Sequence, residues 1–270
     1  MNIDEQEQLK ERQHQEDLQR IRGFRMMDDD FMNACFDGNI EGTELILRII
    51  LNKPDLMVKR VETQKLMKNL QGRDIWLDID AVDSRGSLYD CEIQRADKGA
   101  GFKRARYHAS IMDAHALETG EDFGQLPDSY VIFITENDVI KGNEPIYTVE
   151  RQITNMGIPF DDGQHIVYVN GENQNSATEL GKLMHDFSCT NPDDMHFKIL
   201  ADRARFFKED EKGVAHMCKV MEEMRTEAVE RDRIINVKKM LADGLSVEKA
   251  AEYSGLSIEK VREIAGQKSA

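Results

Sequence analysis

Residues 75–94 read IWLDIDAVDSRGSLYDCEIQ, and this stretch decides the fold. Its first part alternates in character, so that one face of an extended strand carries Ile75, Leu77, Ile79 and Ala81. The segment Asp83-Ser84-Arg85-Gly86 has the residue types of a tight turn, and residues 87–94 then resume as a second strand. The stretch therefore predicts a β-hairpin.

Two acidic residues on this hairpin are placed for metal chemistry. Side chains two positions apart share a strand face, so Glu92 and Gln94 project together, and the position of the turn puts Asp78 approximately across from Glu92. Acids on a hairpin usually form only its wet face, but Asp78 interrupts an apolar strand, where an unpaired carboxylate is costly. Carboxylates on adjacent strands can bind Mg²⁺ or Mn²⁺, which would polarise a phosphodiester and activate a water molecule. Asp80 shares a face with Asp78 and is a weaker candidate ligand.

The flanking segments indicate an α/β layer with a mixed sheet. An apolar helix is expected at residues 42–52, with Thr43 as its cap, and a second helix at about 102–118. Buried strands are expected at 129–135 and 165–170, which are short apolar runs. Residues 1–22 are almost entirely polar and predict a solvated helix or a disordered lead-in.

The C-terminal part is expected to be helical. The Gly-Leu-Ser sequence at 244–246 is repeated at 255–257, and in each copy Gly would end one helix and Ser would cap the next. Three short helices are therefore expected at roughly 233–243, 247–253 and 257–265, in a helix-turn-helix outline. The third carries balanced charge, whereas DNA-recognition helices are usually basic, so a self-association module is an equal alternative.

The charge and cysteine content of the chain exclude several classes of function. A formal net charge of −15 argues against binding nucleic acid over the whole surface, but residues 95–106 (RADKGAGFKRAR) hold five basic residues and one acid directly behind the hairpin. Four scattered cysteines form no CxxC pair, which indicates neither a disulfide framework nor a zinc site. His185-Asp186 has no partner histidine at a recognisable spacing and is interpreted as a surface pair. A polar N-terminus and the absence of a long apolar run predict a cytoplasmic protein with no membrane contact.

These motifs together resemble the Rpn family of recombination-promoting nucleases and putative transposases, within the PD-(D/E)XK nuclease superfamily. The resemblance covers roughly residues 23–205. It is carried by short motifs in a fixed order: Met27 to Phe31, Leu77-Asp78-Ile79, Glu92-Ile93-Gln94, Lys103 to Tyr107, Gly120-Glu121-Asp122 and Val131 to Ile134. It implies a restriction-endonuclease-like core, with a mixed central sheet flanked by helices and a C-terminal helical extension.

The resemblance also implies roles for individual residues. Asp78 and Glu92 match the two metal-binding acids, and the carbonyl of Ile93 is expected to complete the metal shell. Glu44 resembles the helix-borne acid of the superfamily, although it could equally pair with Arg48 one turn on. Gln94 takes the place of the motif's lysine, and it can orient water or phosphate but carries no charge. The expected catalytic residues are Asp78, Glu92 and Gln94, and the expected cofactor is Mg²⁺ or Mn²⁺.

The basic segment is expected to contact DNA, through Arg95, Lys103, Arg104, Arg106 and Tyr107. The alternative is a basic helix face that only balances an acidic protein. The expected organisation is a lead-in at 1–22, a nuclease-like domain at 23–205, a charged helical linker at 206–233 and a helix-turn-helix-like module at 234–270.

The leading hypothesis is a metal-dependent DNA endonuclease tied to recombination or a mobile element. One alternative is a nuclease fold retained for DNA or partner contact, with cleavage weak or lost, which the neutral Gln94 and the acidic total favour. Another is a phage-defence or toxin nuclease with the same chemistry. DNA is the expected partner, and self-association is left open.

Overall fold

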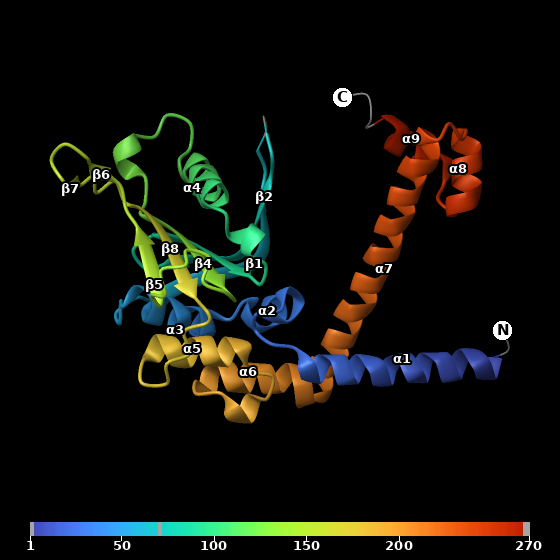
Figure 1. Ribbon diagram of the computed structural model, residues 1–270, viewed down its shortest axis with the longest axis horizontal. Coiled ribbons are helices and arrows are strands. Elements are labelled where there is room, and N and C mark those ends of the chain that lie inside the picture. Colours follow the sequence, from blue (N-terminus) through green and yellow to red (C-terminus); the bar gives the residue numbers. More distant parts are fainter. Residues whose placement is uncertain (1–2, 70–71, 267–270) are drawn as a thin grey trace. The chain divides into compact units, whose positions relative to one another are not determined.

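The computed structural model describes residues 3–69 and 72–266 (Figure 1). The chain divides into two compact units, residues 1–214 and 215–270, and each is described by itself. The first unit is a six-stranded mixed sheet flanked by helices, and the second is helical. The fold class expected from the sequence is confirmed.

The sheet has the strand order β1-β2-β3-β4-β8-β5. The pairs β1·β2, β2·β3 and β8·β5 are antiparallel, whereas β3·β4 and β4·β8 are parallel. All seven residues of β4 are buried, as its unbroken apolar run predicted. The strands are β1 (Val58–Met67), β2 (Ile75–Asp83), β3 (Leu88–Gln94), β4 (Ser129–Thr135), β5 (Ile146–Val149) and β8 (Gln164–Asn170), and β6 (Gln152–Ile153) pairs with β7 (Ile158–Pro159) outside this sheet.

The predicted hairpin is confirmed as β2 and β3. Ile79 lies opposite Cys91 and Asp80 opposite Asp90 in this antiparallel pair. The turn is held by buried Asp83, whose carboxylate accepts hydrogen bonds from the amides of residues 85 and 87 (2.8 and 2.9 Å) and from the hydroxyl of Tyr89 (2.9 Å). Gly86 has a φ of 91°, a conformation that residues with a Cβ rarely adopt.

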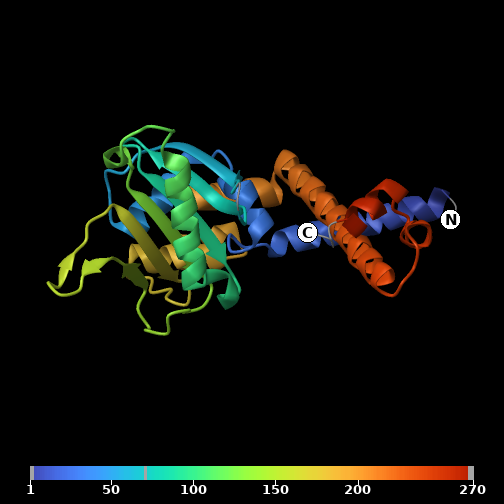
Figure 2. The same ribbon diagram turned by 90° about the horizontal axis from the view of Figure 1, so that it is seen from above.

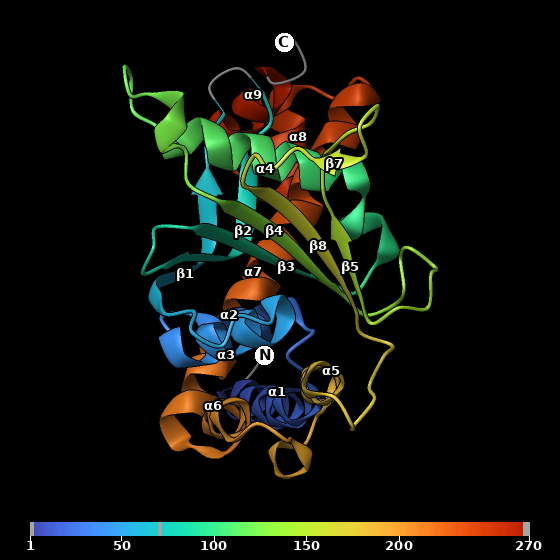
Figure 3. The same cartoon turned by 90° about the vertical axis from the view of Figure 1, so that its left-hand side faces the viewer.

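Helices cover both faces of the sheet (Figure 3). Helix α4 (Phe102–Ala116) lies on one face, and seen from above it crosses the strands (Figure 2). Its small residues Ala105 and Ala109 pack against Leu77, Val131 and Phe133 of the sheet. On the other face lie α2 (Asp29–Phe36) and α3 (Ile40–Leu51), with α1 (Ile3–Gly23), α5 (Glu179–Ser188) and α6 (Lys198–Glu209) beyond them.

Three local features add to or correct the sequence-based expectations. The cap of α3 is Asn39, whose side chain accepts from Gly42 N at 2.9 Å, while the hydroxyl of Thr43 is buried without a hydrogen-bond partner. Strand β1 was not predicted, because its alternation is masked by charged residues and broken at Gln64, which has a φ of 51°. For the polar N-terminal stretch, the structure shows the helix of the two predicted alternatives, as α1, although Ile21 near its end is buried.

The second unit comprises most of α7 (Glu211–Ala242) with α8 (Val247–Ser254) and α9 (Ile258–Gly266). The expected helix at 233–243 is only the end of the longer α7. The predicted caps are present, since the Ser246 hydroxyl accepts from Lys249 N and Gly255 is left-handed with a φ of 69°. A small core of Val237, Ala250, Ala251, Val261 and Ile264 joins the three helices. None of the helices in the described part of the chain has the length and apolar character of a membrane span.

Candidate active site

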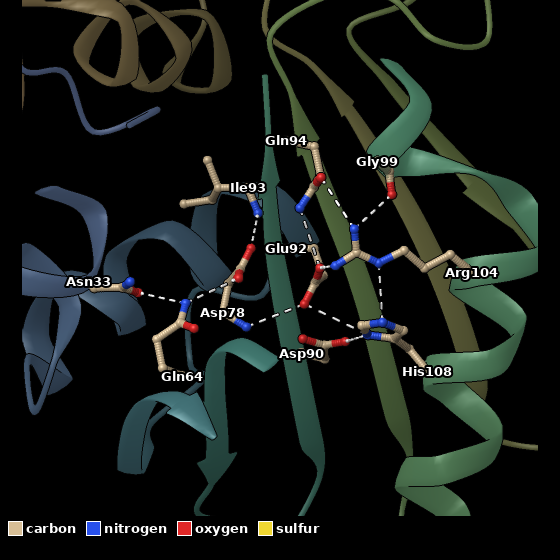
Figure 4. Close-up of polar contacts among 10 residues, drawn as sticks. All are labelled: Asn33, Gln64, Asp78, Asp90, Glu92, Ile93, Gln94, Gly99, Arg104 and His108. Carbon is tan, nitrogen blue, oxygen red and sulfur yellow. Dashed lines mark hydrogen bonds and ion pairs between the residues drawn. The ribbon is translucent and has the colours of Figure 1, made fainter. Parts of the chain in front are cut away.

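Three carboxylates gather on the hairpin. Asp90 and Glu92 lie two residues apart on β3, so they share a face, and both are fully buried. Asp78 on β2 is close to both. With His108 of α4, these acids form what we call the sheet cluster: Asp78, Asp90, Glu92 and His108 (Figure 4).

Asp78 and Glu92 each accept a hydrogen bond from a backbone amide of the other residue's strand. The carboxylate of Asp78 accepts from the amide of Ile93 at 3.0 Å, and Oε1 of Glu92 accepts from the amide of Asp78 at 3.3 Å. Asp78 also accepts from Gln64 Nε2 at 3.4 Å, whereas Glu92 is turned toward α4 (Figure 4). The two predicted acids are thus neighbours across the hairpin, and Ile93 meets Asp78 through its N–H group.

A hydrogen-bonded chain from α4 holds the buried end of the cluster. Arg104 forms an ion pair with Glu92, and its Nε donates to Nε2 of His108 at 3.2 Å. Nδ1 of His108 lies 2.8 Å from Oδ2 of Asp90. Since Arg104 can only donate, His108 accepts at Nε2 and donates from Nδ1, which is the pattern of a neutral imidazole. Burial lowers the pKa of His108 and so favours the same neutral form.

The carboxylates destabilise one another's charged forms. Burial, followed by repulsion from Asp90 and Asp78, raises the pKa of Glu92 to about 9, although Arg104 and His108 oppose the shift. Burial and the charge of Asp78 also raise the pKa of Asp90 well above its usual range. Burial raises the pKa of Asp78 as well. Such shifts are typical of groups that act at a functional site.

The donor set fits a divalent cation. Oδ1 of Asp90 is buried with no hydrogen-bond partner, although an unpaired buried carboxylate oxygen is costly. Ligand atoms of Asp90, Glu92 and His108 lie within 4.8 Å of one another. Several carboxylate oxygens at one buried point suit a hard cation such as Mg²⁺ or Mn²⁺, which would relieve their mutual repulsion.

Gln94 lies beside Glu92, at the end of the same strand face. Its Nε2 is 3.5 Å from Oε2 of Glu92, and its Oε1 accepts from Arg104 at 3.3 Å. Gly99 makes room for this side chain, since a Cβ there would lie 1.8 Å from Oε1 of Gln94. The glycine after β3 therefore permits the close approach of the Gln94 side chain.

Two candidate acids have partners elsewhere. Glu44 forms an ion pair with Arg48 at 2.7 Å and accepts from the amide of residue 58 at 2.9 Å, which is the alternative pairing that the sequence left open. Asp80 is buried, but Arg60 and Lys65 pair with it at 2.7 and 2.8 Å. The structure does not bring Glu44 to the sheet cluster, and it neutralises Asp80 with two cations.

A basic cleft adjoins the sheet cluster. It has a volume of 840 Å³ and lies between the start of β2 and the first turns of α4. Its lining includes Asp74, exposed Trp76 and the cations Arg73, Lys98, Lys103, Arg104 and Arg106. Within residues 3–69 and 72–266, Arg73, Lys98, Lys103 and Arg106 form no ion pair with a carboxylate, so their charge remains available to an anion.

The other predicted DNA contacts have partners within the protein. Arg104 is bonded to Glu92, Gln94 and the Gly99 carbonyl. Arg95 pairs with Asp28 and Glu136 at 2.7 and 3.3 Å. The hydroxyl of Tyr107 donates to the Arg73 carbonyl at 2.6 Å and accepts from Asn69 at 2.9 Å. Arg104 and Tyr107 still line the basic cleft, whereas Arg95 does not.

Sequence reasoning missed Asp90, His108, Arg73 and Trp76. Asp90 carried a signal, because it shares a strand face with Glu92 and Gln94 and stands among apolar residues. His108 had a weaker one, since it lies one helical turn after Arg104 on the same face. Nothing local pointed to Arg73 and Trp76, which reach the cleft through the path of β2 beside α4.

Comparison with known families agrees with the geometry. Residues 30–251 match the family described as PD-(D/E)XK nuclease family transposase. The matched segment includes the whole sheet, the sheet cluster, all of α7 and the first part of α8. Neither the curated proteins nor the solved structures gave a significant match to the chain.

Proposed function

The chain belongs to the PD-(D/E)XK nuclease family transposases, and we propose that it is a divalent-metal-dependent DNA endonuclease whose active site is the sheet cluster. The observation that carries this proposal is the burial of Asp90 and Glu92 at one point, with half-buried Asp78 on the neighbouring strand, beside a basic cleft. A buried acidic centre next to free cationic side chains suits the cleavage of a polyanion, because the acids need a cation and the substrate needs positive contacts. A role in recombination or in a mobile element is part of the proposal.

Asp78, Glu92 and Asp90 are the residues that would hold the cation, with Mg²⁺ or Mn²⁺ as the ion. When bound, such an ion supplies Lewis-acid polarisation of the phosphodiester and a lowered pKa for the attacking water. Arg104 fixes the carboxylate of Glu92, and neutral His108 fixes that of Asp90. The amide of Gln94 can orient a water molecule or a phosphate oxygen by hydrogen bonding, in place of the charge that a lysine would bring.

The basic cleft would bind the DNA backbone. Lys103 and Arg106 on α4, Arg73 before β2 and Lys98 before α4 can each meet a phosphate. Trp76, with 53% of its surface exposed, offers an aromatic face to an unstacked base. Arg95, Arg104 and Tyr107 already have hydrogen-bond partners within the protein, so they are weaker candidates for these contacts.

Plasmid cleavage tests the proposal. Purified protein is incubated with supercoiled plasmid in Mg²⁺, Mn²⁺ or EDTA, and we expect nicking only with a divalent cation. Asp78→Asn should abolish it without unfolding the protein. Asp232→Asn, on the exposed surface of α7, is the matched control and should cut like the parent. Cleavage in EDTA, or full activity in Asp78→Asn, would refute the assignment.

The main alternative is a nuclease fold that binds DNA without cutting it. The neutral Gln94 is the specific observation that favours this alternative. Tight DNA binding in the cleft, together with no cleavage under any cation by a protein that still binds Mn²⁺, would support it over the proposed nuclease.

A further inference from the structure

A second group of metal-ligating side chains lies where α5 passes into α6. His185 is in the last turn of α5, Cys189 is its C-terminal cap, and His196 comes just before α6. Asp186 lies among them and is fully buried, so the interpretation of His185-Asp186 as a surface pair was wrong, because the chain folds His196 back onto it. We call His185, Asp186, Cys189 and His196 the interhelix cluster. It contains none of the residues used in the proposed active site.

The side chains of this cluster are within reach of one ion. Cys189 Sγ lies 3.9 Å from both ring nitrogens of His185. The rings of His185 and His196 have centroids 4.9 Å apart. Ligand atoms of His185, Asp186 and His196 all lie within 4.8 Å of one another. Because His196 is exposed and His185 half-buried, an ion can enter from solvent and the rings can adjust to it.

The backbone that carries these side chains is held in place. The two carboxylate oxygens of Asp186 accept from the amides of His196 and Phe197, each at 2.8 Å, and so fix the start of α6. The amide of Cys189 donates to the Asp186 carbonyl at 3.3 Å. Lys208 donates its ammonium group to the Thr190 carbonyl next to Cys189. All three potential ligands are therefore positioned by contacts that need no metal, which lowers the entropic cost of binding one.

We propose that His185, Cys189 and His196 bind a Zn²⁺ ion, with Asp186 orienting His185. Thiolate and imidazole are the preferred ligands of zinc, whereas Mg²⁺ prefers oxygen. Nδ1 of His185 lies 3.4 Å from Oδ1 of Asp186, so a shared N–H would direct Nε2 to the ion, as carboxylates commonly do for zinc-bound histidine. The ion would fasten the end of α5 to the start of α6.

Cobalt substitution tests this proposal directly. Chelator-treated full-length protein is titrated with Co²⁺ alone, and the absorption spectrum is recorded. We expect one equivalent to produce a near-ultraviolet thiolate-to-cobalt band and the visible bands of a tetrahedral site, with Zn²⁺ displacing the cobalt. Cys189→Ser should remove the thiolate band. His196→Gln should weaken Co²⁺ binding by about 100-fold, since it removes a ligand directly.

Matched variants separate this site from the proposed active site. Cys218→Ser and His115→Gln change the same residue types elsewhere and should leave the cobalt spectrum unchanged. Asp78→Asn should also leave it unchanged, so a failure of the nuclease proposal would not affect this result. Zn²⁺ should raise the melting temperature of the parent but not that of His196→Gln. No thiolate band in the parent, or a band that survives Cys189→Ser, would overturn the proposal.

Discussion

The sheet cluster and the interhelix cluster use the same residue types in opposite ways. Both combine carboxylate with histidine within 4.8 Å. In the sheet cluster the carboxylates lack enough hydrogen-bond donors, and Oδ1 of Asp90 has no hydrogen-bond partner. In the interhelix cluster both oxygens of Asp186 are occupied by backbone amides at the start of α6.

The difference shows that burial alone does not define a reactive carboxylate. Asp90 and Asp186 are both fully buried. Asp186 stabilises the fold through its charge, because the amides at a helix N-terminus favour an anion. Asp90 and Glu92 oppose each other's charge, so their cluster costs stability that a bound cation would restore. The first arrangement is structural, and the second is typical of a catalytic centre.

The largest expected effect is on plasmid cleavage, which should depend on the sheet cluster and not on the interhelix cluster. Glu92→Gln should lower metal-dependent plasmid cleavage by at least about 1,000-fold, roughly 4 kcal/mol of transition-state stabilisation, because it removes an anionic ligand. His196→Gln should change cleavage by no more than about threefold when metal and temperature are matched. Initial nicking rates for both variants, with Glu222→Gln as an exposed control, measure the contrast. Equal losses in both variants would mean that the clusters act together.

The next effect concerns Asp186. We expect Asp186→Asn to lower the free energy of unfolding by about 3 kcal/mol, because an amide replaces a buried anion that accepts two backbone hydrogen bonds. Urea unfolding of the protein in EDTA measures this cost without any contribution from metal. Asp193→Asn, in the short 3-10 helix Pro192–Asp194 nearby, is the control, because its exposed side chain forms only a surface ion pair with Arg205. An unchanged midpoint would show that the two hydrogen bonds to Asp186 contribute little.

Glu92→Gln should raise the free energy of unfolding in the same urea assay, whereas Asp186→Asn lowers it. The folded-state pKa of Glu92 is raised from 4.5 to about 9, so the unfolded chain releases this proton at lower pH than the folded protein does. Stability is therefore lost as pH rises through this window, and the neutral amide should avoid the loss. We expect Glu92→Gln to be more stable by about 2 kcal/mol at pH 7 in EDTA, with the difference vanishing near pH 4.5. A difference that grows toward low pH would contradict the proposed electrostatics.

The smallest effect concerns the basic cleft. Affinity for duplex DNA falls as salt rises, and Lys103→Ala and Arg106→Ala should each make the slope of log affinity against log salt less negative by about 0.9, because each loses one phosphate contact. Fluorescence anisotropy in EDTA measures binding without cleavage. Lys198→Ala removes an exposed lysine of α6 and should leave the slope unchanged. Identical slopes in all the variants would mean that DNA binds elsewhere.

Sequence patterns predicted the parts of the molecule that depend on near neighbours. The alternation of residues 75–82, the turn at Asp83 to Gly86 and the apolar run of β4 each specify a local conformation, and each is confirmed. Strand parity also indicated that Asp78 and Glu92 would be close. The expectation failed where a strand is mostly polar, as in β1, because its apolar pattern is too weak to read.

By itself, then, the sequence determined the hairpin, the family and the pair of acids at its centre, since periodicity and turn chemistry act over a few residues. Only the tertiary structure decided which distant side chains meet these acids. His108 reaches Asp90 because α4 packs its small residues on the sheet, and Arg73 joins the cleft because β2 runs beside that helix. His196 meets His185 for a similar reason, because Asp186 and Lys208 fold the intervening loop back on itself. Such contacts depend on how separate helices and strands pack together, and no local sequence pattern specifies that packing.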